Sequence, residues 1–281
     1  MKRPLSLSAG LSILPLLLAA APALAQIDPA PLDPTPVDST PVAVAGGSEL
    51  TSVLPGASQL VITAPLAIGL NSGAAGEPIS IPLDVYWGLS DDFTLGITHS
   101  NGTIQGVAPY RAGNGVCLTK DDCFGQKIYN NIGFDALVRL VPGMLQLAGH
   151  GGIDLDSLDP SRIALRLGLL AKAPLGTNVA IVADPRFRIG LNERDLNPDG
   201  LTLPVAVQFQ TLSGIRLSGM TGISGPLENF GDFFQGWLGA FAGLGFNEKI
   251  EGFASFTFDN LYGNNGGGDF RTLVLGANIR P

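Results

Sequence analysis

The feature of this chain that most constrains its fold is a period-two alternation of apolar and polar side chains, which recurs from residue 58 to the C-terminus. The segment 161–172 is the clearest case. Its apolar face carries Ile163, Leu165, Leu167, Leu169 and Ala171, and its polar face carries Arg162, Arg166 and Lys172. Successive side chains of a β-strand point to opposite faces, whereas a helix would scatter these charges around its circumference. The pattern therefore predicts strands that have one apolar and one polar face.

Twelve segments with this pattern follow one another, and long and short connections alternate between them. The predicted strands cover residues 58–70, 79–89, 92–101, 127–140, 144–154, 161–173, 177–190, 200–210, 212–222, 235–246, 249–259 and 269–280. An antiparallel meander with short turns at one end and long loops at the other produces this alternation, and both termini then lie at the short-turn end. An open sheet of this size would leave two bare edges, so we expect it to close into a barrel.

The composition indicates which solvent the two faces meet. Hydrophobic residues make up 45% of the 281 residues, charged residues only 14%, and the mean hydropathy is +0.30. These values exclude a disordered chain, and the net charge of −8 argues against nucleic acid as a partner. Beyond the N-terminus no apolar run approaches the roughly 18 residues of a membrane-spanning helix. We therefore predict an all-β fold, a closed antiparallel up-and-down transmembrane β-barrel of about 12 strands over residues 58–281.

One predicted hairpin carries a recognisable motif. The run Val85–Ile97, with the sequence Val-Tyr-Trp-Gly-Leu-Ser-Asp-Asp-Phe-Thr-Leu-Gly-Ile, is similar to the Tyr-x-Gly-hydrophobic-Ser/Thr-Asp-x-Phe/Leu-x-Leu-Gly hairpins of porin-like proteins. Residues 58–281 as a whole resemble a Gram-negative outer-membrane β-barrel. The resemblance implies outer-membrane lipid and the barrel-assembly machinery as partners. Such barrels usually end in an aromatic residue, and this chain departs from that pattern because it ends in Pro281.

The N-terminal 57 residues have the features of an export signal followed by a linker. Two basic residues precede the apolar segment Leu5–Ala20, and Ala23-Leu24-Ala25 is a small-x-small cleavage motif. We therefore predict a signal peptide over residues 1–25, cleavage after Ala25 and an outer-membrane location. Residues 26–57 carry three proline-rich pentads, which favour a disordered, extended linker.

The polar strand faces supply the predicted lining of the lumen. By parity the inward side chains are Arg139, Arg162, Arg166, Lys172, Arg186, Arg188, Arg216, Asp84, Asp135, Asp154 and Asp184. Clustered guanidinium groups would concentrate small anionic solutes, whereas cross-strand ion pairs would fill the barrel instead. Counting outward from the turns places Arg166 opposite Asp184 and Asp135 opposite His150. Twelve strands is a width at which both an open pore and a filled barrel remain possible.

The remaining motifs concern loops. Cys117 and Cys123 are expected to form a disulfide in an oxidising compartment, with free thiols as the alternative. The adjacent His99 and Ser100 are similar to the His-x-Ser-Asn stretch of outer-membrane phospholipase and lipid A deacylase, although neighbours in a strand point to opposite faces. The stretch Asp195–Gly200 matches half of a calcium loop, but a turn uses the same residues. We expect no metal and no cofactor.

These observations lead to one expected function and two alternatives. The first is a small diffusion channel with a weak preference for anions, whose mouth is shaped by loop 102–126. The second is a structural or surface-binding barrel without a transport role, which would use its acidic external loops. The third is a lipid hydrolase, and we predict no enzymatic activity because the His–Ser spacing does not suit it.

Overall fold

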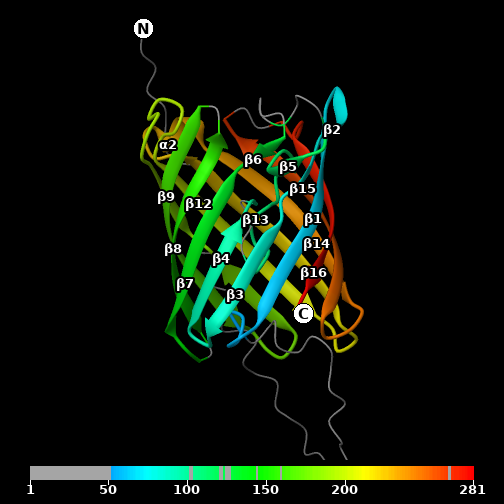
Figure 1. Ribbon diagram of the computed structural model, residues 1–281. Helices are drawn as coiled ribbons and strands as arrows, with labels where there is room; N and C mark the ends of the chain where they lie inside the picture. Colours follow the sequence, from blue (N-terminus) through cyan, green and yellow to red (C-terminus); the bar gives the residue numbers. More distant parts are fainter. Residues whose placement is uncertain are drawn as a thin grey trace, which may run out of the picture. The chain divides into compact units, whose positions relative to one another are not determined.

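The structure is a computed structural model, and it describes residues 52–100, 104–119, 123, 128–143, 145–158, 160–264 and 267–281. The predicted signal peptide, its cleavage site after Ala25 and most of the predicted linker lie outside the described residues. The part that is described forms a β-barrel whose strands are linked edge to edge in one sheet (Figure 1).

Twelve antiparallel strand positions make up the wall, which confirms the predicted strand number. In chain order the wall contains β1 (Leu60–Asn71), β2 (Ala74–Ile81) with β3 (Asp84–Ser90), β4 (Phe93–Thr98), β7 (Ile132–Val141), β8 (Gln146–Leu158), β9 (Ser161–Pro174), β10 (Val179–Ala183) with β11 (Arg186–Gly190), β12 (Gly200–Gln210), β13 (Ile215–Pro226), β14 (Gln235–Gly245), β15 (Ile250–Gly263) and β16 (Arg271–Ile279). The first and last strands pair, with Leu66 opposite Leu275, and this pairing closes the barrel. Among the described strands, this pairing joins β1 to β16, which would otherwise be bare at the edges of an open sheet.

Two wall positions are built from two strands each. Strand β1 pairs with β3 near the short-turn end and with β2 near the long-loop end, and β9 likewise pairs with β10 and then with β11. The predicted loop 71–78 is therefore wrong, because Ala74 pairs with Asn71 and the hairpin continues to the turn at Ser72–Gly73. The sequence hides this hairpin because its side chains lack the apolar alternation of the rest.

Two short strands, β5 (Gly115–Cys117) and β6 (Tyr129–Asn130), continue the wall above the end of β4. Strand β5 pairs with β2 on one side and with β6 on the other. Gly115 has a φ of +76°, and a Cβ at this position would lie 2.2 Å from the carbonyl oxygen of Ile81. Only glycine fits such a conformation and approach. Strand β5 thus continues the wall, while residues 104–114 lie inside the barrel.

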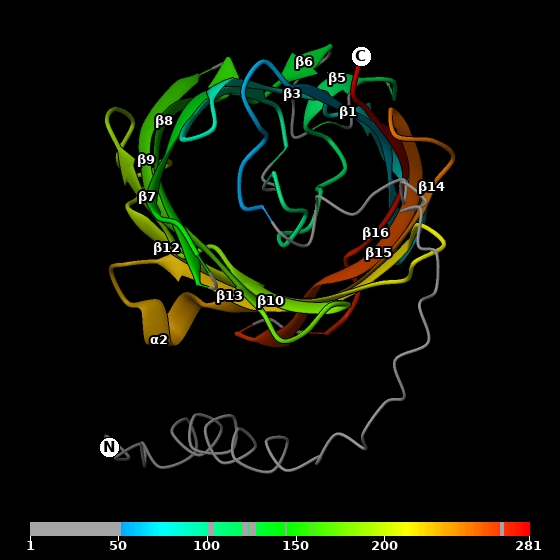
Figure 2. The ribbon, with the colours of Figure 1, turned by 90° about the horizontal axis from the view of Figure 1, so that it is seen from below.

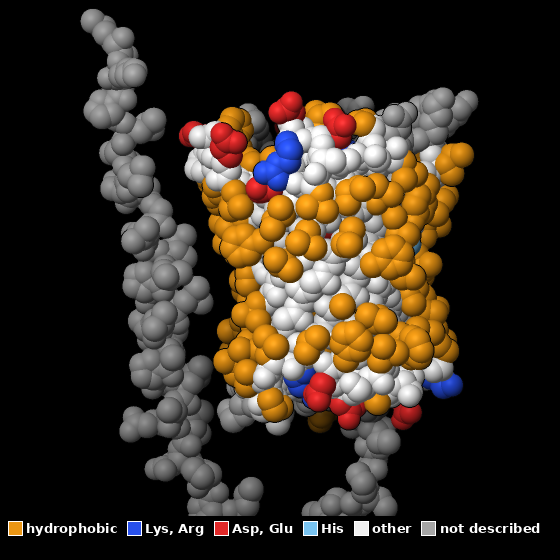
Figure 3. All heavy atoms as spheres, turned by 60° about the vertical axis from the view of Figure 1, so that its left-hand side comes forward, with side chains coloured by type: hydrophobic (Ala, Val, Ile, Leu, Met, Phe, Trp, Pro, Cys, Tyr) orange, Lys and Arg blue, Asp and Glu red, His pale blue; other side chains and the backbone are white. Residues whose placement is uncertain are grey.

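The outer surface is a belt of apolar side chains, as the alternation predicted. Large exposed members include Leu95, Phe134, Leu167, Phe187, Val207, Leu217, Leu238 and Leu275. Figure 3 shows this belt over one side of the barrel, between rims where charged side chains gather. The described residues include no helix that is long and apolar enough to cross a membrane. The short helix α2 (Phe230–Phe233) lies in the connection between β13 and β14.

Part of the barrel interior is filled by chain that folds inward. Two segments lie within the ring of strands, Ser52–Gly56 and Ile104–Asn114 (Figure 2). Their buried side chains Val53, Leu54, Val107, Tyr110 and Ala112 join inward-facing wall residues in one apolar cluster. The ring of Tyr110 stacks on Phe253 at 6.1 Å, and Phe253 stacks on Phe241 at 5.3 Å. The first segment belongs to the stretch that the sequence assigned to the linker, and the second belongs to the loop predicted to shape the mouth.

Candidate functional site

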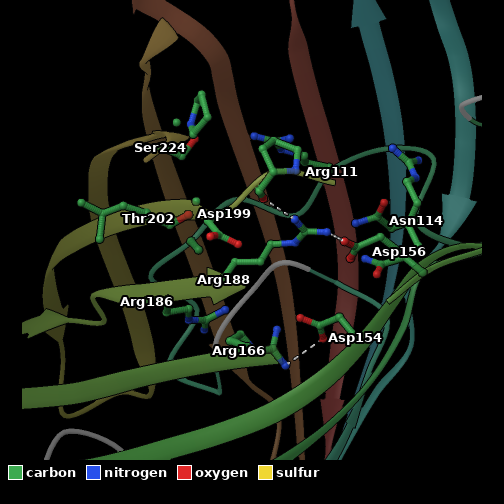
Figure 4. Close-up of a pocket in the computed structure, with 18 of the residues that line it drawn as sticks. Arg111, Asn114, Asp154, Asp156, Arg166, Arg186, Arg188, Asp199, Thr202 and Ser224 are labelled. Carbon is green, nitrogen blue, oxygen red and sulfur yellow. Dashed lines mark hydrogen bonds and ion pairs between the residues drawn. The ribbon is translucent and has the colours of Figure 1, made fainter. Parts of the chain in front are cut away.

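A chamber of about 420 Å³ lies inside the barrel near the long-loop end, and we call it the upper chamber. One wall of this chamber carries four arginines, Arg162 and Arg166 from β9 and Arg186 and Arg188 from β11. They share a face because residues an even number of positions apart in a strand point to the same side. The two strands are neighbours, with Arg188 opposite Arg166. Arg111 of the inserted segment also lines the chamber (Figure 4).

Carboxylates from the same wall hold these guanidinium groups in place. Arg166 Nη2 lies 3.3 Å from Asp154 Oδ1 and 3.7 Å from Asp135 Oδ2. Arg186 Nη2 lies 2.7 Å from Asp184 Oδ2, and Arg188 donates to Asp156. Figure 4 shows Arg166 and Arg188 directed at Asp154 and Asp156. Arg166, Arg186 and Arg188 are therefore held in place by carboxylates rather than freely moving.

Two predicted cross-strand pairings fail in register. Arg166 lies opposite Arg188 and not opposite Asp184, because the turn Leu175–Asn178 is centred later than the sequence count assumed. Asp135 lies opposite Gly152 and not opposite His150. The contact with His150 nevertheless exists, since its Nδ1 lies 3.5 Å from Asp135 Oδ1 along a diagonal. Its Nε2 bonds to Asp184 Oδ1 at 2.8 Å.

A second chamber, of about 290 Å³, lies near the short-turn end, and we call it the lower chamber. Its lining includes Arg139, Arg216 and Arg280, with Asp91 as the acidic member. Arg216 Nε donates to Glu251 Oε1 at 2.9 Å, and Arg139 Nε lies 3.7 Å from Asp92 Oδ1. In the upper chamber five arginines face Asp154, Asp156 and Asp199. The residues that line the two chambers thus include more basic than acidic side chains, while Asp92, Asp135, Asp184 and Glu251 pair with four of these arginines from outside that lining.

The two other predicted lumen residues hold the inserted segments. Lys172 is fully buried, and its Nζ donates to Gln105 Oε1 at 2.8 Å and to the carbonyl oxygen of Ser52 at 3.3 Å. Asp84 accepts the backbone N–H of His99 at 2.7 Å and of Ser100 at 3.0 Å, and it also accepts the Ser100 hydroxyl. These contacts fix the place where the chain leaves β4. Lys172 thus bonds both inserted segments, and Asp84 bonds the residues that directly follow β4.

The loop motifs have structural partners. His99 Nε2 contacts the hydroxyl of Tyr129, while Ser100 is bonded to Asp84, so His99 and Ser100 do not form a nucleophile–base pair. Cys117 and Cys123 form a disulfide with their Cα atoms 6.1 Å apart, which confirms that prediction. The described residues contain no group of three or more His, Cys, Asp or Glu arranged to hold a metal ion.

The stretch Asp195–Gly200, which matches half of a calcium loop in sequence, is a turn whose side-chain oxygens accept hydrogen bonds from arginines. Arg188 donates to the Asn197 side chain, and Arg194 bonds both carboxylate oxygens of Asp199 at 2.8–2.9 Å. The hydrogen bonds from Arg194 hold the pKa of Asp199 below its usual range. Guanidinium groups thus satisfy the oxygens that a cation would need.

Sequence reasoning missed the side chains that join the inserted segments to the wall. Gln146 accepts the backbone N–H of Val53 at 2.8 Å, and Gln208 donates to the backbone oxygen of Gln105 at 2.8 Å. An uncharged Gln on a polar strand face carries no signal of such a role. The apolar residues Val107 and Tyr110 within a long loop were the one available sign that the loop is buried.

A closed twelve-strand antiparallel barrel, with an apolar exterior and short turns opposite long loops, is the fold of porin-like outer-membrane β-barrels. No protein-family model and no curated protein sequence matches the chain. The fold is similar to the KdgM porin solved in complex with disordered oligogalacturonate, with a TM-score of 0.54 and 8% identity over 78% of this chain and 98% of that chain. It is equally similar to the NanC porin, with a TM-score of 0.55 and 8% identity over 78% of this chain and all of that one. With sequence identities of 8%, these structural similarities establish a shared fold and nothing more.

Proposed function

We propose that this protein is an outer-membrane diffusion channel that prefers small anionic solutes. The observation that carries the proposal is the excess of arginine in both chambers of the lumen, five against three acids in the upper chamber and three against one in the lower. A narrow space with low-dielectric walls concentrates the field of such groups and raises the local concentration of counter-ions. Selective pores use rings or rows of charged side chains in the same way.

The ion pairs of the arginines are compatible with this role. A guanidinium has five N–H donors in a fixed fork, so a partner carboxylate leaves donors for a second acceptor. Arg162 donates to the carbonyl oxygen of Leu196 at 3.3 Å, and Arg111 lines the chamber from the opposite, inserted side. A carboxylate or phosphate group in the chamber could thus be bound from two sides.

The size of the chamber and the fold neighbours suggest the class of solute. A volume of about 420 Å³ lies within the range of pockets that hold small molecules. The structure of the KdgM porin was solved with oligogalacturonate, a chain of acidic sugars. We propose acidic mono- or disaccharides and similar small carboxylates as the solutes of this barrel.

A structural or surface-binding barrel is the second candidate, and the packed lumen favours it. Val53, Val107 and Tyr110 are buried in one apolar cluster inside the barrel, and neighbouring residues of their segments line the two chambers, so we infer that a solute passes only when inserted chain moves. A barrel that never opens would keep the fold and lose the transport role.

A swelling experiment on proteoliposomes separates the two candidates. The full-length protein is reconstituted, and swelling rates are compared in iso-osmotic glucuronate and glucose at neutral pH. We expect faster swelling in glucuronate, and we expect Arg162→Glu to abolish the difference. The control Lys249→Glu alters an exposed turn residue outside both chambers and should change nothing. Equal rates for the two sugars, or no swelling with either, would contradict the proposed function.

A further inference from the structure

The end of the lumen that carries the short turns is closed by the chain itself. Residues Ser52–Gly56 precede β1 and lie within the barrel, where they line the lower chamber together with Ile104 and Gln105. Val53 is 0% exposed and Leu54 is 2% exposed. A stretch directly before the first strand has no need to be buried to complete the wall, since β1 is fully paired without it. We call Ser52–Gly56 the plug segment.

A few polar contacts to separate elements hold the plug segment. Its backbone donates from Val53 to the Gln146 side chain of β8 at 2.8 Å, and from Gly56 to the side chain of the nearby Gln59 at 2.9 Å. Its backbone oxygens accept from Gln105 at 3.0–3.3 Å and from Lys172 at 3.3 Å. None of these contacts is a strand ladder. The segment is thus seated by two apolar side chains and by side-chain donors, which separate more easily than paired strands.

The wall of the barrel is shaped to receive this segment. Gly88 lies on β3 with its Cα buried on the inner face, and its backbone bonds to Ser58 and Gln59 at 2.7 and 2.8 Å. A Cβ on Gly88 would lie 2.2 Å from the backbone oxygen of Gly56 and 3.1 Å from that of Pro55. The chain crosses the strand at a distance that only glycine permits. This close approach is a second observation, independent of the buried side chains, that the segment has a built seat.

The surface beneath the plug segment is polar and basic. Lys172 and Gln146 bond the plug segment from the wall, and Gln208 bonds the adjoining Gln105. Removing the segment would therefore leave a lining of the same chemical kind as the two chambers. A permanently filled lumen could pack apolar wall residues against the plug segment, whereas this wall presents polar side chains there.

We propose that the plug segment is a displaceable gate, and that its withdrawal toward the short-turn end joins the lower chamber to the upper one. The inference rests on the proposed channel function, and it names the part of the chain that opens the channel. Withdrawal needs no break in the barrel wall, because the strand ladders of β1 do not include the segment, and the chain joins the wall only after it, where Ser58 and Gln59 bond the backbone of Gly88. Gln105 bonds both Ser52 and Val53, so withdrawal also frees the start of the inserted segment Ile104–Asn114, which shifts with the gate.

Two variants displace the gate by different means. Val53→Ser with Leu54→Ser removes the apolar anchors without adding charge, and the control is Ala57→Ser at an exposed position of the same stretch. Gly88→Ala leaves the segment unchanged and occupies its seat. The control for it is Gly219→Ala, because a Cβ at Gly219 meets nothing within 4 Å. Losing two buried anchors should shift the ratio of open to closed barrels roughly a hundredfold.

The test compares single-channel recordings of the full-length protein in planar bilayers with thiol labelling of Leu54→Cys. We expect both gate variants to open far more often than the parent chain and the two controls, and Leu54→Cys to react much more slowly than Ala57→Cys. A parent chain that conducts as fully as the gate variants would overturn the proposal. If the variants fail to fold, equal labelling rates at positions 54 and 57 would overturn it instead.

A third result separates the gate from the function on which it rests. If Gly88→Ala makes Leu54→Cys react rapidly while every folded variant stays electrically silent, the segment moves as proposed and the channel function is contradicted. If the gate variants conduct but favour cations, the gate is supported and the anion preference fails.

Discussion

The Nζ atom of Lys172 donates a hydrogen bond of 2.8 Å to Oε1 of Gln105, a residue 67 positions earlier in the chain. The bond joins the wall strand β9 to the inserted segment, and the same Nζ also bonds Ser52. One basic side chain thus connects the wall, the inward loop and the plug segment. The interior of this barrel is organised around such contacts between side chains and inserted backbone.

Lys172→Met is therefore expected to loosen both inserted segments. Methionine keeps the length of the side chain but cannot donate, so the oxygens of Gln105 and Ser52 lose a donor. We predict a rise of at least roughly tenfold in the open fraction, because each of the two lost bonds contributes about 1 kcal/mol. Single-channel recordings check this, with Lys249→Met on an exposed turn as the control. An open fraction below that of the parent chain would show that Lys172 has no latching role.

The apolar belt makes a prediction about membrane insertion. Leu167 lies in the middle of β9 and is 46% exposed to the outside. Leu167→Lys should destabilise the folded state in bilayers by about 2–4 kcal/mol, the cost of a lysine at the midplane. Leu212→Lys, at a turn residue that is 77% exposed, should cost much less. Denaturant titration in lipid vesicles measures both, and equal costs would contradict the placement of the belt in the membrane.

The disulfide between Cys117 and Cys123 should stabilise the long loop without determining the barrel. Cys117 ends β5, which pairs with Ser80 of β2. Replacing both cysteines with serine should lower stability by roughly 2 kcal/mol, as expected for a short closed loop. The β-sheet signal in circular dichroism should persist while the loop becomes more sensitive to protease. Loss of the barrel itself would refute this assignment, and so would unchanged protease sensitivity.

Ser100 should prove structural and not catalytic. Its hydroxyl bonds Asp84, which keeps two backbone N–H donors when the hydroxyl is removed. Ser100→Ala should therefore lower stability by about 1 kcal/mol. Neither the parent chain nor the variant should hydrolyse acyl esters. Hydrolysis that disappears in Ser100→Ala would reinstate the lipid hydrolase as a candidate.

Much of the wall follows from local pattern. The predicted strands 161–173 and 200–210 coincide closely with β9 (Ser161–Pro174) and β12 (Gly200–Gln210), because each carries its own alternation of lipid-facing and inward residues. The alternation of turn and loop lengths supplied the topology. Such features depend only on neighbouring residues and on the two solvents that the wall separates.

The interior could not be predicted in the same way. The register between β9 and β11 depends on the width of the turn after Pro174, and a shift of a few residues replaced the expected partner of Arg166. Whether a loop folds inward depends on donors from distant strands, as with Gln208 and Gln105. These contacts join residues that no local pattern relates, so the filling of the lumen is visible only in the folded chain.

The central claim, that the lumen is an anion-preferring passage, is tested most directly by the reversal potential of the full-length protein in a planar bilayer under a salt gradient. We predict a reversal potential of the sign that favours the anion. The preference should diminish or invert in Arg111→Glu with Arg162→Glu and persist in Lys249→Glu. A reversal potential of zero or of the cation-favouring sign, or one that the arginine substitutions leave unchanged, would contradict the account.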